Sequence, residues 1–107
     1  MGGLFFAPGT ELDARFSARM KSLTNLRMLD VSKCSIPANF FSKLSSPRLE
    51  VVYASDSNLS DQHCKSLAKF ADLKLVIARD TDTTRLGAEA ITAANPEVRV
   101  EFWYDDG

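Results

Sequence analysis

The stretch from Leu26 to Ile36 reads Leu-Arg-Met-Leu-Asp-Val-Ser-Lys-Cys-Ser-Ile, and its apolar spacing decides the fold. The spacing L-x-x-L-x-L-x-x-C-x-I recurs twice along the chain, after 23 and then 24 residues. The recurring positions are Leu26, Leu29, Val31, Cys34 and Ile36, then Leu49, Val52, Ala54, Ser57 and Leu59, then Leu73, Val76, Ala78, Thr81 and Thr83. A fixed period of this length is typical of repeat units that bury a continuous core only when stacked.

The second part of each unit keeps the register and has helical spacing. Its paired positions are Phe41 and Leu44, then Cys64 and Leu67, then Ala88 and Ile91. Alternating apolar residues indicate a strand, and apolar residues three or four positions apart indicate a helix. Each unit is therefore predicted to hold a strand followed by a helix, and Val100 and Phe102 are predicted to face inward from a last strand.

Three helices are predicted in this way. The first begins near Pro37, the second begins at its N-cap Ser60, and the third spans roughly residues 85–94 before Asn95-Pro96 stops it. The residues expected to face inward are Phe40, Phe41 and Leu44 in the first helix, Cys64, Leu67, Ala68 and Ala71 in the second, and Leu86, Ala90, Ile91 and Ala94 in the third.

These spaced positions resemble the leucine-rich-repeat family over roughly residues 11–102. The segment from Leu59 to Leu67 is similar to the start of the helix in the cysteine-containing, ribonuclease-inhibitor-like repeats of that family. The resemblance implies an α/β solenoid with a parallel strand ladder on its concave face and helices on its convex face. It also implies protein binding rather than catalysis.

With 107 residues, of which 45% are hydrophobic, the chain is predicted to be a single domain. The glycines near the start and Pro8-Gly9 favour an irregular segment over residues 1–10. A helix is predicted next, from a capping box at Thr10 and Asp13 and the helical spacing of Leu12, Phe16, Met20 and Leu23. The predicted divisions are an N-terminal helix or cap at 1–24, repeats at 25–47, 48–71 and 72–95, and a last strand and cap at 96–107.

The net charge of -1 comes from 13 basic and 14 acidic residues that are interspersed, which does not favour a nucleic-acid or membrane partner. No apolar run approaches the roughly 20 residues of a transmembrane helix, and Leu4-Phe5-Phe6-Ala7 lacks the basic leader of a signal peptide. We therefore expect an intracellular, cytoplasmic protein. Cys34 and Cys64 are expected to be reduced and buried, and the sequon Asn58-Leu59-Ser60 is of a kind common by chance.

Two features of the sequence are candidate sites of chemistry. Asp80-Thr81-Asp82 follows an apolar run, as the Asp-x-Asp motif does in haloacid-dehalogenase-like phosphatases, but no Lys occurs in the 23 residues after Thr84. A small metal-dependent α/β enzyme using Asp80 and Asp82 is a minor alternative. His63, the sole histidine, is expected on an exposed helix surface rather than at a metal. The sequence predicts no catalytic residue, metal site or cofactor.

Alternation along a strand sends neighbouring side chains to opposite faces of a sheet. If Leu29 and Val31 face inward, Met28 and Asp30 face outward. The register then predicts three outward columns, namely Met28, Val51, Leu75 and Arg99, then Asp30, Tyr53, Ile77 and Glu101, then Ser32, Ser55, Arg79 and Trp103.

An apolar block stands out among these outward residues, and it consists of Met28, Val51, Tyr53, Leu75 and Ile77. A contiguous apolar patch rimmed by charge is typical of a protein-binding surface. The predicted binding residues are Met28, Asp30, Val51, Tyr53, Leu75, Ile77, Arg79, Glu101 and Trp103. We therefore expect a non-enzymatic protein-interaction module. The alternatives are a homo-oligomer built on the same face, or a face covered by flanking sequence such as the Leu4-Phe5-Phe6 arm.

Overall fold

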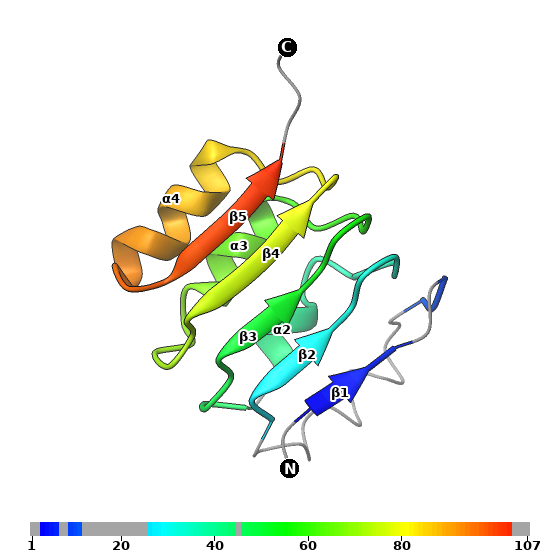
Figure 1. Ribbon diagram of the computed structural model, residues 1–107, viewed down its shortest axis with the longest axis horizontal. Coiled ribbons are helices and arrows are strands. Elements are labelled where there is room, and N and C mark those ends of the chain that lie inside the picture. Colours follow the sequence, from blue (N-terminus) through cyan, green and yellow to red (C-terminus); the bar gives the residue numbers. More distant parts are fainter. Residues whose placement is uncertain (1–2, 7–8, 12–25, 45, 104–107) are drawn as a thin grey trace.

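A computed structural model describes residues 3–6, 9–11, 26–44 and 46–103 of the chain. The described part is an α/β structure (Figure 1). Its elements in chain order are β1 (Gly3–Phe5), β2 (Met28–Asp30), α2 (Phe40–Lys43), β3 (Val51–Tyr53), α3 (Asp61–Leu67), β4 (Leu75–Arg79), α4 (Arg85–Ala94) and β5 (Arg99–Trp103).

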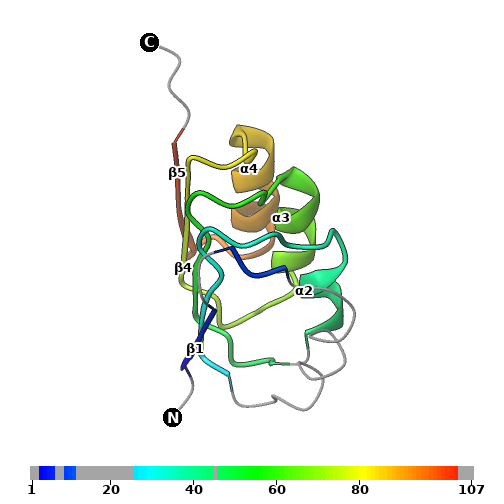
Figure 2. The same cartoon turned by 90° about the vertical axis from the view of Figure 1, so that its right-hand side faces the viewer.

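The strands form one five-stranded sheet in the order β1-β2-β3-β4-β5, and every neighbouring pair is parallel. Parallel neighbours need a crossover connection, and α2, α3 and α4 lie in the crossovers between β2 and β5. All three helices lie on the same side of the sheet (Figure 2). The other side of the sheet carries no helix among the described residues, and we call it the open face.

The predicted strand register is confirmed. Met28 lies opposite Val51, Val51 opposite Leu75, and Leu75 opposite Arg99. The second column, Asp30, Tyr53, Ile77 and Glu101, is aligned in the same way, and Arg79 lies opposite Trp103. Leu29, Val52 and Val76 are fully buried between these outward positions, so the inward and outward assignments are also right.

The turn after each of the middle strands adopts the same conformation. Lys33, Asp56 and Asp80 occupy equivalent positions, and their φ angles are 60°, 56° and 55°. A left-handed conformation is uncommon for residues other than glycine, although Asp tolerates it better than most. Three such residues in one register show that the turns, and not only the strands, repeat along the chain.

The cysteine position of the repeat explains how this turn is closed. The Cys34 thiol donates to the Ser32 carbonyl at 3.4 Å. Ser57 and Thr81 stand at the same position in the next units, and their hydroxyls donate to the carbonyls of Ala54 and Ala78 at 2.6 and 2.8 Å. The thiol bonds the carbonyl two residues back and the hydroxyls bond the carbonyl three residues back. Cys, Ser and Thr at this position therefore each donate to a carbonyl of the same turn.

The core lies between the sheet and the helices. Phe40 and Phe41 supply its largest side chains and meet edge to face, with centroids 5.2 Å apart. Val100 and Phe102 of β5 are only partly buried against this core. Their inward placement agrees with the prediction.

The predicted helix boundaries are confirmed for α4, which spans Arg85–Ala94, and for α3, which follows Ser60. The helix expected near Pro37 begins later, at Phe40. The inward faces were predicted less well. Leu86 is 73% exposed, and Ala71 and Ala94 are exposed as well. The buried positions are Gly87, Ala88 and Ile91 in α4, and His63, Cys64 and Leu67 in α3, with Phe70 just after α3.

The irregular segment expected over residues 1–10 is wrong, because Gly3–Phe5 forms β1 and pairs with β2. Leu4 lies opposite Leu29, and Phe6 donates its amide to the Asp30 carbonyl at 3.1 Å. Subtracting 25 from the positions of Leu29 and Val31 would have found Leu4 and Phe6, so a signal was present. The helix predicted from Leu12 to Leu23 lies outside the described residues.

Candidate functional site

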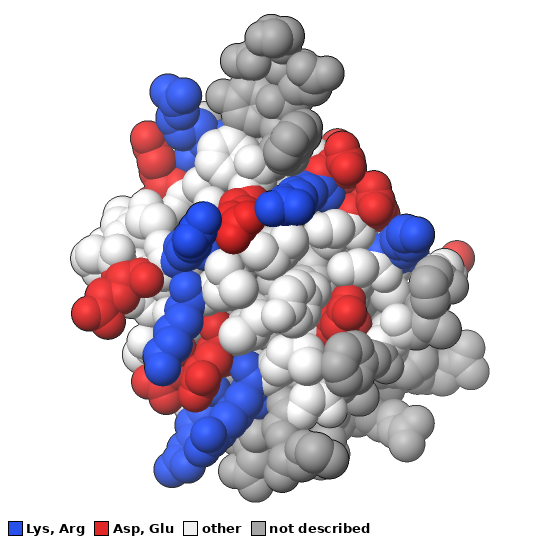
Figure 3. All heavy atoms as spheres, viewed as in Figure 1, with Lys and Arg blue, Asp and Glu red and all other residues white. Residues whose placement is uncertain are grey.

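The open face presents the outward side chains of β2, β3 and β4. The apolar block of Met28, Val51, Tyr53, Leu75 and Ile77 lies in its centre, and each of these residues is half-buried. Strands about 4.8 Å apart place registered side chains in contact, so these residues cover part of one another. Figure 3 shows this face as an uncharged centre with charged side chains around it.

Cover by the N-terminal arm is contradicted for the described residues. The arm does not cross the open face, because Gly3–Phe5 extends the sheet beside β2. Phe6 packs against the core instead. The apolar block is therefore not covered by this strand.

Charged groups flank the block on the side of β5. The Arg79 guanidinium donates to Glu101 Oε1 at 2.8 Å, and Arg99 Nε lies 3.3 Å from Glu101 Oε2. The Arg79 and Arg99 side chains are 52% and 78% exposed, so these pairs contribute little to stability. Each carboxylate oxygen of Glu101 thus faces a different arginine, so this border of the block carries one acid between two bases.

The two remaining predicted residues are placed differently. Asp30 is half-buried at the end of β2, where its Oδ1 accepts the Ser32 amide at 3.0 Å. The Trp103 backbone pairs with Arg79 at the end of β5, and the Trp103 side chain lies outside what the structure describes. The nine predicted residues thus belong to one sheet, and Tyr53, Ile77 and Glu101 lie side by side across it.

The prediction that His63 is exposed is wrong. The side chain is 3% exposed, and its ring lies edge to face with Phe41 at 6.2 Å. Nδ1 accepts the Ser60 amide at 3.0 Å, so Nε2 carries the proton and donates to the carbonyls of Ile36 and Pro37, both at 3.0 Å. The histidine caps its own helix and binds the preceding unit. A histidine three residues after a serine N-cap is the signal that was missed.

Neither cysteine is arranged as a nucleophile. Burial raises the pKa of Cys64 to about 11, and burial also raises the pKa of Cys34. Both thiols are buried and neither forms a disulfide, as the sequence predicts. A thiol with a raised pKa is poorly reactive because the thiolate is the attacking species.

The carboxylates considered for metal chemistry are dispersed. Asp80 is an exposed turn residue, and the Asp82 amide donates to the Leu59 carbonyl at 2.9 Å, which joins two units. Nowhere in residues 3–6, 9–11, 26–44 and 46–103 do three His, Cys, Asp or Glu side chains gather into a group that would hold a metal. The Asn58 amide of the sequon is also engaged, because it donates to Ile36 O at 3.0 Å and accepts Ile36 N at 2.6 Å.

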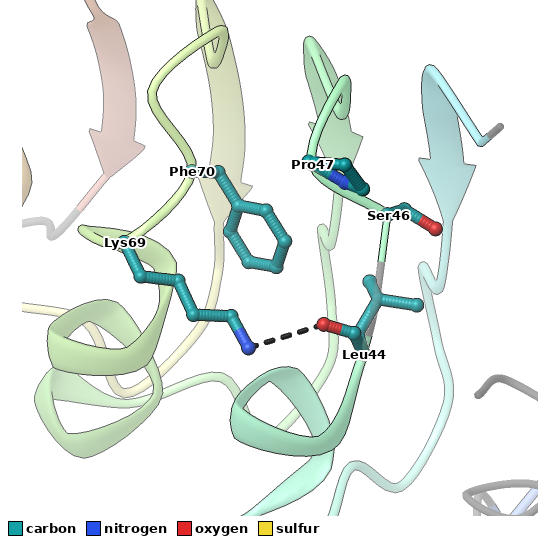
Figure 4. A pocket seen from close by; sticks show the side chains of 5 residues that line it. All are labelled: Leu44, Ser46, Pro47, Lys69 and Phe70. Carbon is teal, nitrogen blue, oxygen red and sulfur yellow. Dashed lines mark hydrogen bonds between the residues drawn. The ribbon is translucent and has the colours of Figure 1, made fainter. Parts of the chain in front are cut away.

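A pocket of about 330 Å³ lies on the helix side, lined by Leu44, Ser46, Pro47, Lys69 and Phe70 (Figure 4). Lys69 Nζ donates to the carbonyls of Ser42 and Leu44 at 3.0 and 3.1 Å and lies 5.0 Å from the centre of the Phe70 ring. Burial lowers the pKa of Lys69. The ammonium thus satisfies carbonyls at the end of α2, and no pattern in the sequence predicts this pocket.

Among the described helices, none is long and apolar enough to cross a membrane. Comparison with known proteins gave no match to a family model, to a curated protein or to a solved structure.

Proposed function

We propose that the chain is a short leucine-rich-repeat solenoid that acts as a non-enzymatic interaction module and binds a protein partner through its open face. The sequence period of 23 and 24 residues, the parallel ladder in sequential strand order and the repeated turns after β2, β3 and β4 support the family assignment. In a stack of such units the helix side is used to hold neighbours together, which leaves the strand side for recognition.

The apolar block carries the functional part of the proposal. A sheet face in contact with water is ordinarily polar, whereas this one places Val51, Leu75 and Ile77 next to one another at its centre. An apolar patch with charge at its border is the usual composition of a protein interface. Tyr53 and Arg79 add residue types that are enriched among interface hot spots.

The proposal is tested by placing two carboxylates in the block. The variant Tyr53→Asp with Ile77→Asp puts unpaired charges at the centre of the interface, where an unpaired buried charge is costly. We expect that this variant no longer captures the partner in crosslinking experiments in the native cell, while its circular dichroism spectrum remains that of the folded protein. Capture that persists in this variant refutes the proposal.

A matched control carries the same number of new carboxylates on the helix side. Gln62 and Lys65 are both exposed on α3, so Gln62→Asp with Lys65→Asp should leave capture unchanged. A photo-crosslinking residue in place of Leu75 should label the partner, and the same residue in place of Lys65 should not. Equal labelling from both positions would place the interface elsewhere.

A further inference from the structure

The charges at the two ends of the open face differ in sign. At the starts of β2 to β5, the residue before each strand and the first residue of each strand include three bases and one acid, namely Arg27, Lys74, Arg99 and Glu50. The three bases are exposed, the Lys74 ammonium lies 4.0 Å from the Glu50 carboxylate, and Arg99 pairs with Glu101 at 3.3 Å. We call this set the basic rim.

The strand ends carry the opposite balance. The stretch considered runs in each unit from the residue of the second outward column to the turn residue with the left-handed conformation. Its charged residues are the acids Asp30, Asp56, Asp80 and Glu101 and the bases Lys33 and Arg79. Four acids and two bases make this the acidic rim. The apolar block lies between the two rims, so a partner that covers it meets positive charge at one end and negative charge at the other.

The dimensions of the block indicate which shape of partner would cover it. The block spans β2, β3 and β4, so it is two strand spacings or about 10 Å wide, which is the diameter of an α-helix with its side chains. From Lys74 to Asp80 the strand advances by about 20 Å, which a helix covers in about 13 residues. An extended peptide is narrower and would leave part of the block uncovered.

From this geometry we infer that the open face receives an amphipathic helix of a partner protein, about 13 residues long and aligned with the strands. This inference rests on the proposed function. The helix places its apolar stripe on the block, acidic side chains on the basic rim and basic side chains on the acidic rim. Acids near the N-terminus and bases near the C-terminus also stabilise a helix itself, so its N-terminus lies over the strand starts.

Synthetic helical peptides with one shared apolar stripe test the inference. One peptide has Glu at its N-terminal end and Lys at its C-terminal end, and two others have Glu at both ends or Lys at both ends. Because each mismatched end meets a rim of like charge, the Glu/Lys peptide should bind about tenfold more tightly at low salt, and added salt should reduce the difference. Fluorescence anisotropy with the full chain measures the three affinities.

Reversing the basic rim should change the preferred peptide. In the variant Arg27→Glu with Lys74→Glu both rims are acidic, so the peptide with Lys at both ends should become the tightest ligand. Lys43→Glu with Lys65→Glu makes the same change of net charge on exposed positions of the helix side and should leave the order of affinities unchanged.

The other outcomes separate this inference from the proposed function. If the three peptides bind equally and all lose binding in the Tyr53→Asp, Ile77→Asp variant, the face binds protein but the charge inference is overturned. If no peptide binds, or if binding survives that variant, the helical partner is overturned, while capture of the native partner still decides the proposed function.

Discussion

Replacement of His63 by Ala should be among the most destabilising single changes in the chain. The ring is 3% exposed and makes contacts with two units through Ser60, Ile36 and Pro37. The substitution leaves the Ser60 amide without its acceptor and the Pro37 carbonyl without the His63 donor, and each buried unsatisfied group costs about 1–3 kcal/mol. The Ile36 carbonyl keeps the donor from Asn58. Partial relaxation and water entry reduce the sum for the two groups, so we expect a loss of about 2–4 kcal/mol.

Urea unfolding followed by circular dichroism measures this loss. A domain of this size commonly has a free energy of unfolding of about 5–15 kcal/mol, so His63→Ala should lower the midpoint strongly. Gln62→Ala removes an exposed neighbour on the same helix and should change stability by less than about 0.5 kcal/mol. A value below about 1 kcal/mol for His63→Ala would show that the ring does not hold the units together.

Three further predictions concern the contacts between units. Gly87→Ala places a Cβ against the Asp61 carboxylate and 3.1 Å from the Asp61 Cα, so it should destabilise the fold by about 1–3 kcal/mol, and an unchanged thermal midpoint would contradict the close approach of α3 and α4. Burial acts to raise the pKa of Asp61, but hydrogen bonds from the Thr84 hydroxyl and amide outweigh it and the pKa is lowered. The stabilisation by Asp61 is therefore present above its unfolded pKa of about 3.9 and lost as the pH falls through the lower folded pKa, so Asp61→Asn should cost about 1 kcal/mol at pH 7 and progressively less as the pH falls below the unfolded pKa in urea titrations. Cys64 should react with iodoacetamide at neutral pH only as fast as the chain opens, and labelling of the folded protein at the rate of a free thiol, followed by mass spectrometry, would refute its burial.

The strands were predictable because their inward positions repeat. A side chain at Leu29 or Val52 must be apolar and of limited size when neighbouring units stack on it. The spacing of such residues in the sequence therefore indicates the strand register. β1 follows the same rule but is offset by 25 residues, and its Gly3 and the nearby Pro8-Gly9 look like a loop. A search for a constant period therefore misses it.

The helix faces were less predictable because the contact between neighbouring helices depends on which residues allow close approach. Gly87 is buried because the Asp61 carboxylate occupies the space that a side chain would take. That contact places the smallest residue of α4 against α3 and turns Leu86 outward. Hydrophobicity alone assigns Leu86 to the core. The sequence does not show that Asp61 of α3 lies against Gly87, and this contact decides which face of α4 is buried.

The outward columns of the candidate site followed from strand alternation, whereas the interactions among their side chains did not. Alternation places Arg79 and Glu101 on one face, but it does not show that Glu101 is held between Arg79 and Arg99. Side-chain torsions and the small twist between strands decide such contacts. The strand register is thus predictable from the sequence, whereas charge pairing depends on atomic positions that the sequence pattern does not determine.

Apart from the exposed ion pair between Arg79 and Glu101, the polar side-chain links described next lie away from the open face. Asn58, His63 and Lys69 bind carbonyls of the preceding unit, and Asn95 donates to the carbonyls of Ala71 and Leu73 at 3.0 and 3.1 Å. Stability is therefore supplied by the core, the turns and the helix side, and the open face contributes little beyond contacts among its own side chains. Substitutions in the apolar block should for this reason separate binding from folding, whereas substitutions at the polar links should not.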